Sequence, residues 1–173
     1  MVTLNLRFAL RVFVSTASLV VLLTSACNAA FNEETLAGLT GVSNCSAAWG
    51  DYDNDGDLDV AVAGSDAGGV RSSTIYRNDG GGVFTDIGAG LTGVDMCSLA
   101  WGDFDNDGDL DLAVAGSTAV GFENCRIYRN EGLDTFTDIG TFLLGVYGCS
   151  LAWGDFDNDG DLDLVEAGGT SGG

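Results

Sequence analysis

The sequence of 173 residues contains no histidine, no lysine and no proline. Without histidine, the chain cannot form a Ser-His-Asp triad, a Cys-His pair or a histidine-ligated zinc or copper site. Its six cationic residues are all arginines, and they stand against 26 acidic residues for a formal charge of −20. Because the chain is so acidic, we expect no nucleic-acid partner and no electrostatic binding to anionic lipid.

The negative charge does not indicate a disordered chain. Disordered proteins combine high net charge with few apolar residues, whereas 46% of these residues are hydrophobic and only 18% are charged. That apolar content is enough to form a core. The acidic residues are therefore expected to gather in particular segments.

The N-terminal segment has the composition of a signal peptide. Residues 1–30 contain no acidic side chain, and Arg7 and Arg11 precede an uncharged apolar run over residues 12–26. This run is shorter than the roughly 20 residues that a transmembrane helix needs. The pattern predicts a secretory signal peptide over residues 1–29, with a membrane anchor as the alternative.

Two processing sites are open. Small residues at Cys27 and Ala29 fit cleavage after Ala29, whereas residues 23–27 (LTSAC) resemble a bacterial lipobox with its leucine one position too early. The second possibility would place a lipid anchor on Cys27. Either way we expect a secreted or cell-surface protein: extracellular, periplasmic or an outer-membrane lipoprotein.

A repeat with a period of 52 residues organises the rest of the chain. The segments IYRN and FTDIG each occur twice at this spacing. Three tryptophans and three cysteines also follow it: Trp49, Trp101, Trp153, Cys45, Cys97 and Cys149. The period predicts one repeat over residues 31–79, a second over 80–131 and an incomplete third over 132–173.

Each complete repeat is expected to contain four short strands. In the second repeat these are residues 97–101, 110–115, 126–129 and 135–139. The first alternates apolar and small residues, and the second is almost continuously apolar, as in a strand covered on both faces. No capped amphipathic helix appears. The sequence predicts an all-β fold of β-propeller-type blades, each with four antiparallel strands, in about two and a half repeats.

A nine-residue acidic motif separates the first two strands of every repeat. It is DYDNDGDLD at residues 51–59 and DFDNDGDLD at residues 103–111 and 155–163. Each copy contains five aspartates, so fifteen of the 26 acidic residues lie in these three segments. A merely solvated turn does not require three near-identical copies with glycine always at position 6.

The spacing of the motif is suited to chelating a cation. Carboxylates at positions 1, 3, 5 and 9, and a backbone carbonyl at position 7, can surround one ion as Gly at position 6 turns the chain back. An oxygen shell of this size favours Ca²⁺ over Mg²⁺, which needs stricter octahedral geometry. We therefore predict three calcium sites, one per repeat. Their residues are Asp51, Asp53, Asp55, Asp57, Asp59, Asp103, Asp105, Asp107, Asp109, Asp111, Asp155, Asp157, Asp159, Asp161 and Asp163.

The motif does not have the pattern of an EF-hand. An EF-hand loop requires glutamate at position 12 and flanking helices. Position 12 is Val62 in the first repeat, Val114 in the second and Glu166 in the third, and strand residues follow. Glu166 is interpreted as a solvated strand residue rather than a ligand.

These segments together resemble a known family. WGDFDNDGDLDLAVAG at residues 101–116, followed by IYRNEG and FTDIG, resembles FG-GAP/VCBS-type repeats, whose calcium loop is similar to that of integrin α-subunit propellers. The resemblance covers about residues 31–173. It implies propeller blades with calcium between the first two strands, bound by the side chains of positions 1, 3, 5 and 9 and the backbone of position 7. The repeated cysteines are an addition to the family pattern.

The number of repeats leaves two possibilities for the whole assembly. A closed propeller needs 4–8 blades, and this chain supplies about two and a half. The chain is then either a fragment of a longer protein or a subunit that self-assembles with other copies to complete a propeller.

The repeated cysteines and tryptophans have structural interpretations. The cysteines hold equivalent places on successive blades and are expected to lie well apart as small buried residues, with a disulfide from Cys125 as the alternative. The tryptophans are interpreted as blade core rather than sugar-stacking platforms.

The sequence favours a non-catalytic module over an enzyme. Strict repetition provides no unique constellation of polar residues for catalysis. The leading hypothesis is a secreted or cell-surface calcium-binding repeat module for adhesion or recognition of a protein or glycan that the sequence does not identify. The alternative is a fragment or ancillary part of a larger secreted propeller enzyme acting on polysaccharide.

Overall fold

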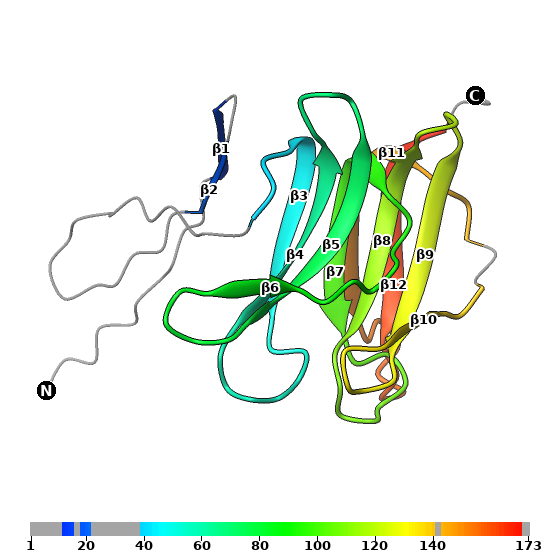
Figure 1. The fold of residues 1–173 in the computed structure, drawn as a ribbon. Coiled ribbons are helices and arrows are strands. Elements are labelled where there is room, and N and C mark those ends of the chain that lie inside the picture. Colours follow the sequence, from blue (N-terminus) through cyan, green and yellow to red (C-terminus); the bar gives the residue numbers. More distant parts are fainter. Residues whose placement is uncertain (1–11, 16–17, 22–38, 141–142, 171–173) are drawn as a thin grey trace, which may run out of the picture.

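The computed structural model describes residues 12–15, 18–21, 39–140 and 143–170, and all regular elements in these ranges are strands (Figure 1). The predicted signal peptide over residues 1–29 and its lipidation site Cys27 lie outside the described residues, except for a short hairpin. That hairpin pairs β1 (Val12–Ser15) with β2 (Ser18–Val21). The described residues contain no helix long and apolar enough to cross a membrane.

Two four-stranded antiparallel sheets and one two-stranded sheet form the repeats. The first sheet contains β3 (Ser43–Gly50), β4 (Asp59–Ser65), β5 (Arg71–Asn78) and β6 (Phe84–Asp86). The second contains β7 (Val94–Gly102), β8 (Asp111–Thr118), β9 (Glu123–Asn130) and β10 (Phe136–Asp138). The third contains β11 (Tyr147–Gly154) and β12 (Asp163–Gly169). In every sheet the strands lie in chain order, so the prediction of an all-β fold with four-stranded antiparallel blades is confirmed.

The same register recurs in all three sheets. Trp101 on β7 pairs with Leu112 on β8, and the next pair joins Gly102 to Asp111. The equivalent pairs in the other sheets are Trp49–Val60, Gly50–Asp59, Trp153–Leu164 and Gly154–Asp163. The register sets the last acidic residue of every loop opposite the glycine that precedes that loop.

The first strand of each sheet also carries a bulge at the same place. The register shifts between Ser43 and Ser46 in the first sheet, and at the matching place in the other two. A residue with positive φ occupies each bulge: Asn44 at 48°, Met96 at 46° and Gly148 at 56°. The bulge is therefore part of the repeat, although its central residue differs from one copy to the next.

The three sheets lie side by side and bury their apolar faces against one another (Figure 1). Alternation places Ala61 and Ala63 of β4 on the face toward the second sheet, where they belong to the same core cluster as Leu112 and Val114 of β8. In the same way Ala113 on the other face of β8 packs toward the third sheet. Small residues on one face and large ones on the other let successive sheets approach closely.

The tryptophans pack in these cores, which confirms that interpretation. Trp49 packs against the cluster of the first sheet, Trp101 against the cluster between the first and second sheets, and Trp153 against the cluster between the second and third. Each of the three is partly buried.

The prediction that the repeated cysteines lie well apart is wrong. The Cys97 sulfur lies 3.5 Å from the carbonyl oxygen of Ala63 and 3.7 Å from that of Asn44, both in the first repeat. Cys149 makes the equivalent contact with Met96, at 3.7 Å. The reason is that β7 packs directly against β3 on one side and β11 on the other, so equivalent positions of successive repeats become neighbours. Cys45, Cys97, Cys125 and Cys149 are all free thiols.

Candidate metal centre

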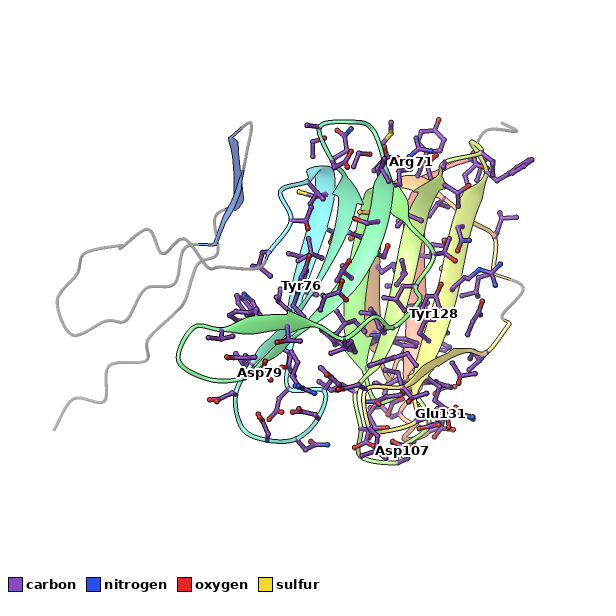
Figure 2. The ribbon with its side chains drawn as sticks, viewed as in Figure 1. Arg71, Tyr76, Asp79, Asp107, Tyr128 and Glu131 are labelled. Carbon is purple, nitrogen blue, oxygen red and sulfur yellow. The ribbon has the colours of Figure 1, made fainter. Side chains whose placement is uncertain are left out.

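The three acidic loops lie at the same end of the molecule. Each loop connects the first strand of a sheet to its second strand, namely β3 to β4, β7 to β8 and β11 to β12. In Figure 2, Asp107 marks the end that carries the loops, and Arg71 lies at the opposite end. The repeat in sequence thus becomes a row of loops in space.

Two residues of each loop turn the chain back on itself. Asn54 at position 4 has a φ of 60° and Gly56 at position 6 has a φ of 94°. The other two loops have nearly the same angles at both positions. A methyl group on Gly56 would meet nothing within 4 Å, so the left-handed backbone alone requires glycine there. The predicted turn at position 6 is confirmed, and asparagine, which tolerates the left-handed region, supports it at position 4.

Carboxylates from positions 1, 3 and 9 converge in every loop. In each loop, one oxygen from each of these three residues lies within 4.8 Å of the other two. The three sets are Asp51, Asp53 and Asp59; Asp103, Asp105 and Asp111; and Asp155, Asp157 and Asp163. Three negative charges this close repel one another, and a divalent cation between them would remove the repulsion.

Positions 5 and 7 lie outside these three-residue sets. The carboxylate of Asp55 accepts a hydrogen bond of 2.8 Å from the backbone N–H of Asp57, and the bond recurs in the other loops at 2.9 and 3.0 Å. One oxygen at position 5 therefore closes the turn. The ligand roles of these two positions stay predictions for Asp55, Asp57, Asp107, Asp109, Asp159 and Asp161.

The position-9 aspartate is the most buried member of the first two sets. Asp59 and Asp111 are both 0% exposed. Asp59 accepts a hydrogen bond of 3.1 Å from the N–H of Tyr52 within its loop and one of 2.8 Å from the N–H of Asn78 on β5. In the second repeat, Phe104 and Asn130 donate equivalent bonds to Asp111. This residue thus joins the loop to the third strand of its sheet.

Burial perturbs the ionisation of these carboxylates. It raises the pKa of Asp59 to about 6, with the N–H groups of Asn78 and Tyr52 acting in the opposite direction. The pKa of Asp111 also rises to about 6 for the same reasons, and burial raises the pKa of Asp53. Buried carboxylates with raised pKa values are ones for which a bound cation would be a strong stabilising partner.

Asp51 shows that the first loop fits a hard cation. One of its oxygens, Oδ2, accepts a hydrogen bond of 3.1 Å from the N–H of Gly56. The other, Oδ1, is buried and has no hydrogen-bond donor. An unsatisfied buried carboxylate oxygen is costly, and carboxylate oxygen is the ligand that Ca²⁺ and Mg²⁺ prefer. In the second and third loops this oxygen accepts a backbone N–H from position 5 instead.

Adjacent loops are joined by a side-chain contact that the sequence analysis did not identify. The amide of Asn54 donates a hydrogen bond of 2.8 Å to Asp109 of the second loop, and Asn106 donates one of 2.9 Å to Asp161 of the third. Position 4 of one loop thus binds position 7 of the next. The identical asparagine in all three motifs was the available signal, but its partner lies 55 residues away.

A small hollow lies between the first two loops. Its lining includes Tyr52, Arg77, Asp109 and Asp134. Tyr52 donates a hydrogen bond of 2.6 Å to Asp134, which also pairs with Arg77. Burial, and then this hydrogen bond, raises the pKa of Tyr52 above its ordinary value. The lining groups are thus already engaged with one another.

The comparison with known families agrees with this geometry. A family model described as an FG-GAP-like repeat matches residues 51–114 and 116–166. The first matched segment begins at the first acidic loop and ends in β8, and the second begins in β8 and ends in β12. Comparison with curated proteins and with solved structures finds no match. Since the family model covers more than half of the chain, the protein belongs to the FG-GAP-like repeat family.

Proposed function

We propose that this chain is a non-catalytic calcium-binding repeat module, secreted or held at the cell surface, that recognises a protein or glycan. The observation that carries the proposal is the convergence of three carboxylates, from positions 1, 3 and 9, within 4.8 Å in each of three loops. The buried Oδ1 of Asp51, which has no hydrogen-bond donor, supports it. Recognition and an extracellular location rest on the family and on the composition of residues 1–29.

In this proposal calcium has a structural role and stabilises the folded protein. Each ion would join a strand hairpin to its loop, since the ligands include position 1 at the end of one strand and position 9 at the start of the next. Binding to the folded state alone adds to the free energy of unfolding, by about 2.7 kcal/mol when free calcium is 100 times the dissociation constant. The loops would then present a fixed surface to a ligand.

Thermal unfolding tests the proposal. We expect the melting temperature to rise by several degrees in millimolar Ca²⁺ relative to a chelator, and to rise much less in equal Mg²⁺. Replacing the position-1 aspartates should abolish the calcium-dependent part of the shift. The test variant carries Asp51→Asn, Asp103→Asn and Asp155→Asn together, which keeps an oxygen to accept the glycine N–H of each loop.

A control with the same change in charge is available. Asp66, Asp86 and Asp138 each accept a hydrogen bond of 2.8 or 2.9 Å from a nearby glycine N–H but lie outside the acidic loops. The variant with all three changed to asparagine should keep the full response to calcium. A wild-type protein whose melting temperature is the same in Ca²⁺ and in chelator would contradict the proposal.

A further inference from the structure

The two junctions between successive repeats are built from the same contacts. At the first junction, the indole N–H of Trp101 donates a hydrogen bond of 3.1 Å to the carbonyl of Ala48, and its ring stacks on Tyr52 at 6.1 Å between centroids. At the second, Trp153 donates to Ala100 at 3.1 Å and stacks on Phe104 at 6.3 Å. Each repeat thus receives the tryptophan of the repeat that follows it.

A glycine makes room for this tryptophan. A methyl group on Gly50 would lie 2.8 Å from Cδ1 of Trp101, and one on Gly102 would lie 2.7 Å from the same atom of Trp153. Real Cβ atoms essentially never approach other atoms so closely, so any larger residue would push the indole away. The receiving face of a repeat therefore needs an aromatic residue at loop position 2, a carbonyl acceptor and this glycine.

Polar contacts fix the register of both junctions. The hydroxyl of Ser46 accepts a hydrogen bond of 3.2 Å from the N–H of Leu99, and Ser98 accepts one of 3.0 Å from Leu151. At the loop end, the position-4 asparagine donates to the position-7 aspartate of the following loop, at 2.8 and 2.9 Å. At both junctions, successive repeats are therefore held in register by one contact between the strands and one between the loops.

The third repeat presents the same receiving face with nothing described on it. Phe156 is 79% exposed, whereas Tyr52, at the same loop position of the first repeat, is 1% exposed. A methyl group on Gly154 would meet nothing within 4 Å. The carbonyl of Ala152 and the hydroxyl of Ser150 occupy the places of the two acceptors. Val165, 63% exposed, adds apolar surface, and a hollow lined by Trp153, Gly154 and Phe156 lies over this face.

The first repeat presents the complementary edge. Trp49 stands where Trp101 and Trp153 stand in their repeats, and within the described residues its indole N–H has no acceptor. Asp57 likewise holds the place of Asp109 and Asp161, and no described asparagine donates to it. The chain thus carries both halves of a junction that it forms twice within itself.

We propose that the exposed face of the third repeat, formed by Ser150, Ala152, Gly154 and Phe156, binds the Trp49 edge of a second copy of this chain. The indole of Trp49 would stack on Phe156, donate to Ala152 and lie over Gly154. The interface is head-to-tail, so each added copy leaves one receiving face and one tryptophan edge free. Such contacts produce a ring if the rotation closes and an extended chain of subunits if it does not.

Gly154→Val is the test variant. The added side chain points into open space in a single copy, so the fold should be unaffected, but it would overlap the incoming Trp49. We expect the wild type to form concentration-dependent assemblies in sedimentation velocity, and Gly154→Val to weaken association by at least about tenfold. The control is Thr137→Val, at an exposed position of the outer strand β10, which should assemble like the wild type.

The measurement is made in calcium and with a reductant, so that disulfide formation between thiols does not produce assemblies. The comparison between Gly154→Val and Thr137→Val does not depend on whether the acidic loops bind calcium. A second variant, Phe156→Ala, removes a side chain that is 79% exposed and should weaken association. At a concentration low enough to keep both proteins monomeric, it should melt at the same temperature as the wild type.

Mixing tests the head-to-tail arrangement. Because Gly154→Val keeps its Trp49 edge, adding it to the wild type should cap assemblies and reduce their average size. The proposal is overturned if the wild type stays monomeric at its highest soluble concentration. It is also overturned if Gly154→Val assembles like Thr137→Val, or if the mixture shows no reduction in size.

Discussion

The second and third acidic loops have identical sequences but different surroundings. In both, the glycine N–H at position 6 donates to the position-1 aspartate, at 3.0 and 3.1 Å. In both, the N–H at position 2 donates to the position-9 aspartate at 3.1 Å. Yet Asp111 is 0% exposed, whereas Asp163 is only partly buried and Phe156 is 79% exposed. The nine residues thus specify the turn, and their neighbours determine how far it is buried.

Two neighbours account for the difference. The N–H of Asn130 on β9 donates a hydrogen bond of 2.8 Å to Asp111, and the described part of the third sheet has no corresponding strand. Trp153 of the following repeat covers Phe104 at 6.3 Å, and no described tryptophan covers Phe156. The burial of an acidic loop therefore depends on the third strand of its own sheet and on the tryptophan of the next repeat, whereas the turn itself forms without them.

Among matched substitutions in the second and third repeats, those of the position-9 aspartate should differ most in their effect on the free energy of unfolding. Asp111→Ala would leave two buried N–H groups, of Phe104 and Asn130, without an acceptor. At about 1–3 kcal/mol for each unsatisfied group, we expect a loss of about 2–6 kcal/mol in the free energy of unfolding. Asp163→Ala, at the partly buried copy of the same position, should cost less than about 1 kcal/mol. Urea unfolding in a chelator measures both variants without any contribution from calcium, and equal losses would contradict the comparison.

The second largest difference in the free energy of unfolding should appear when the glycine that precedes the acidic loop is replaced in each of these repeats. Gly102→Ala places a methyl group 2.7 Å from Cδ1 of Trp153, whereas Gly154→Ala places it in open space. Overpacking of this kind costs about 1–3 kcal/mol. The matched change at Gly154 should alter the free energy of unfolding by less than about 0.5 kcal/mol. Unfolding at a protein concentration low enough to keep the chain monomeric provides the measurement, and a neutral Gly102→Ala would show that the two repeats do not pack as described.

Much of the fold followed from residues that act locally. Period-2 alternation at residues 97–101 and the apolar run at 110–115 predicted the strands β7 and β8. In the structure β7 begins three residues earlier and ends one later than predicted, and β8 begins one residue later and ends three later. Gly56 predicted a left-handed turn because few other residues tolerate one. In these places the signal and its structural effect lie within a few residues of each other.

What the sequence analysis missed depends on contacts between repeats. Cys97 was expected to lie far from its equivalents, but the first strands of successive sheets pack directly together. Asn54 was not identified as a contact residue, because Asp109 becomes its neighbour only when the sheets are aligned. Spacing along the chain gave the period, and it carried no information about which edges of the repeats meet.

A smaller effect is expected at position 2 of the first loop. Tyr52→Phe removes a hydrogen bond of 2.6 Å to Asp134 but keeps the ring that stacks on Trp101. The second loop has phenylalanine at this position, so the aromatic ring itself fits. We expect a loss of about 1 kcal/mol in the free energy of unfolding. Tyr147→Phe, at an exposed tyrosine, is the control and should cause no measurable change; equal effects would indicate that the hydroxyl of Tyr52 contributes nothing.

The smallest change in stability should come from replacing the residue at the bulge in β7. Met96 has a φ of 46° and is 45% exposed, so its side chain gains little from packing while its backbone is strained. A left-handed residue other than glycine costs about 1–2 kcal/mol, and glycine loses about 0.5–1 kcal/mol through its greater freedom in the unfolded chain. Met96→Gly should therefore stabilise the protein by less than about 1 kcal/mol. The reverse change, Gly148→Ala in β11, should destabilise it by a similar amount, and thermal unfolding with the opposite order would contradict this interpretation.

A calorimetric titration of the chelator-treated protein with Ca²⁺ tests most directly whether the acidic loops bind calcium. We expect three ions per chain, with the number reduced when Asp51, Asp103 and Asp155 are changed together to asparagine. The control variant with Asp66, Asp86 and Asp138 changed should still bind three. A wild-type protein that binds no Ca²⁺, or binds the same number after the loop aspartates are replaced, would contradict the account.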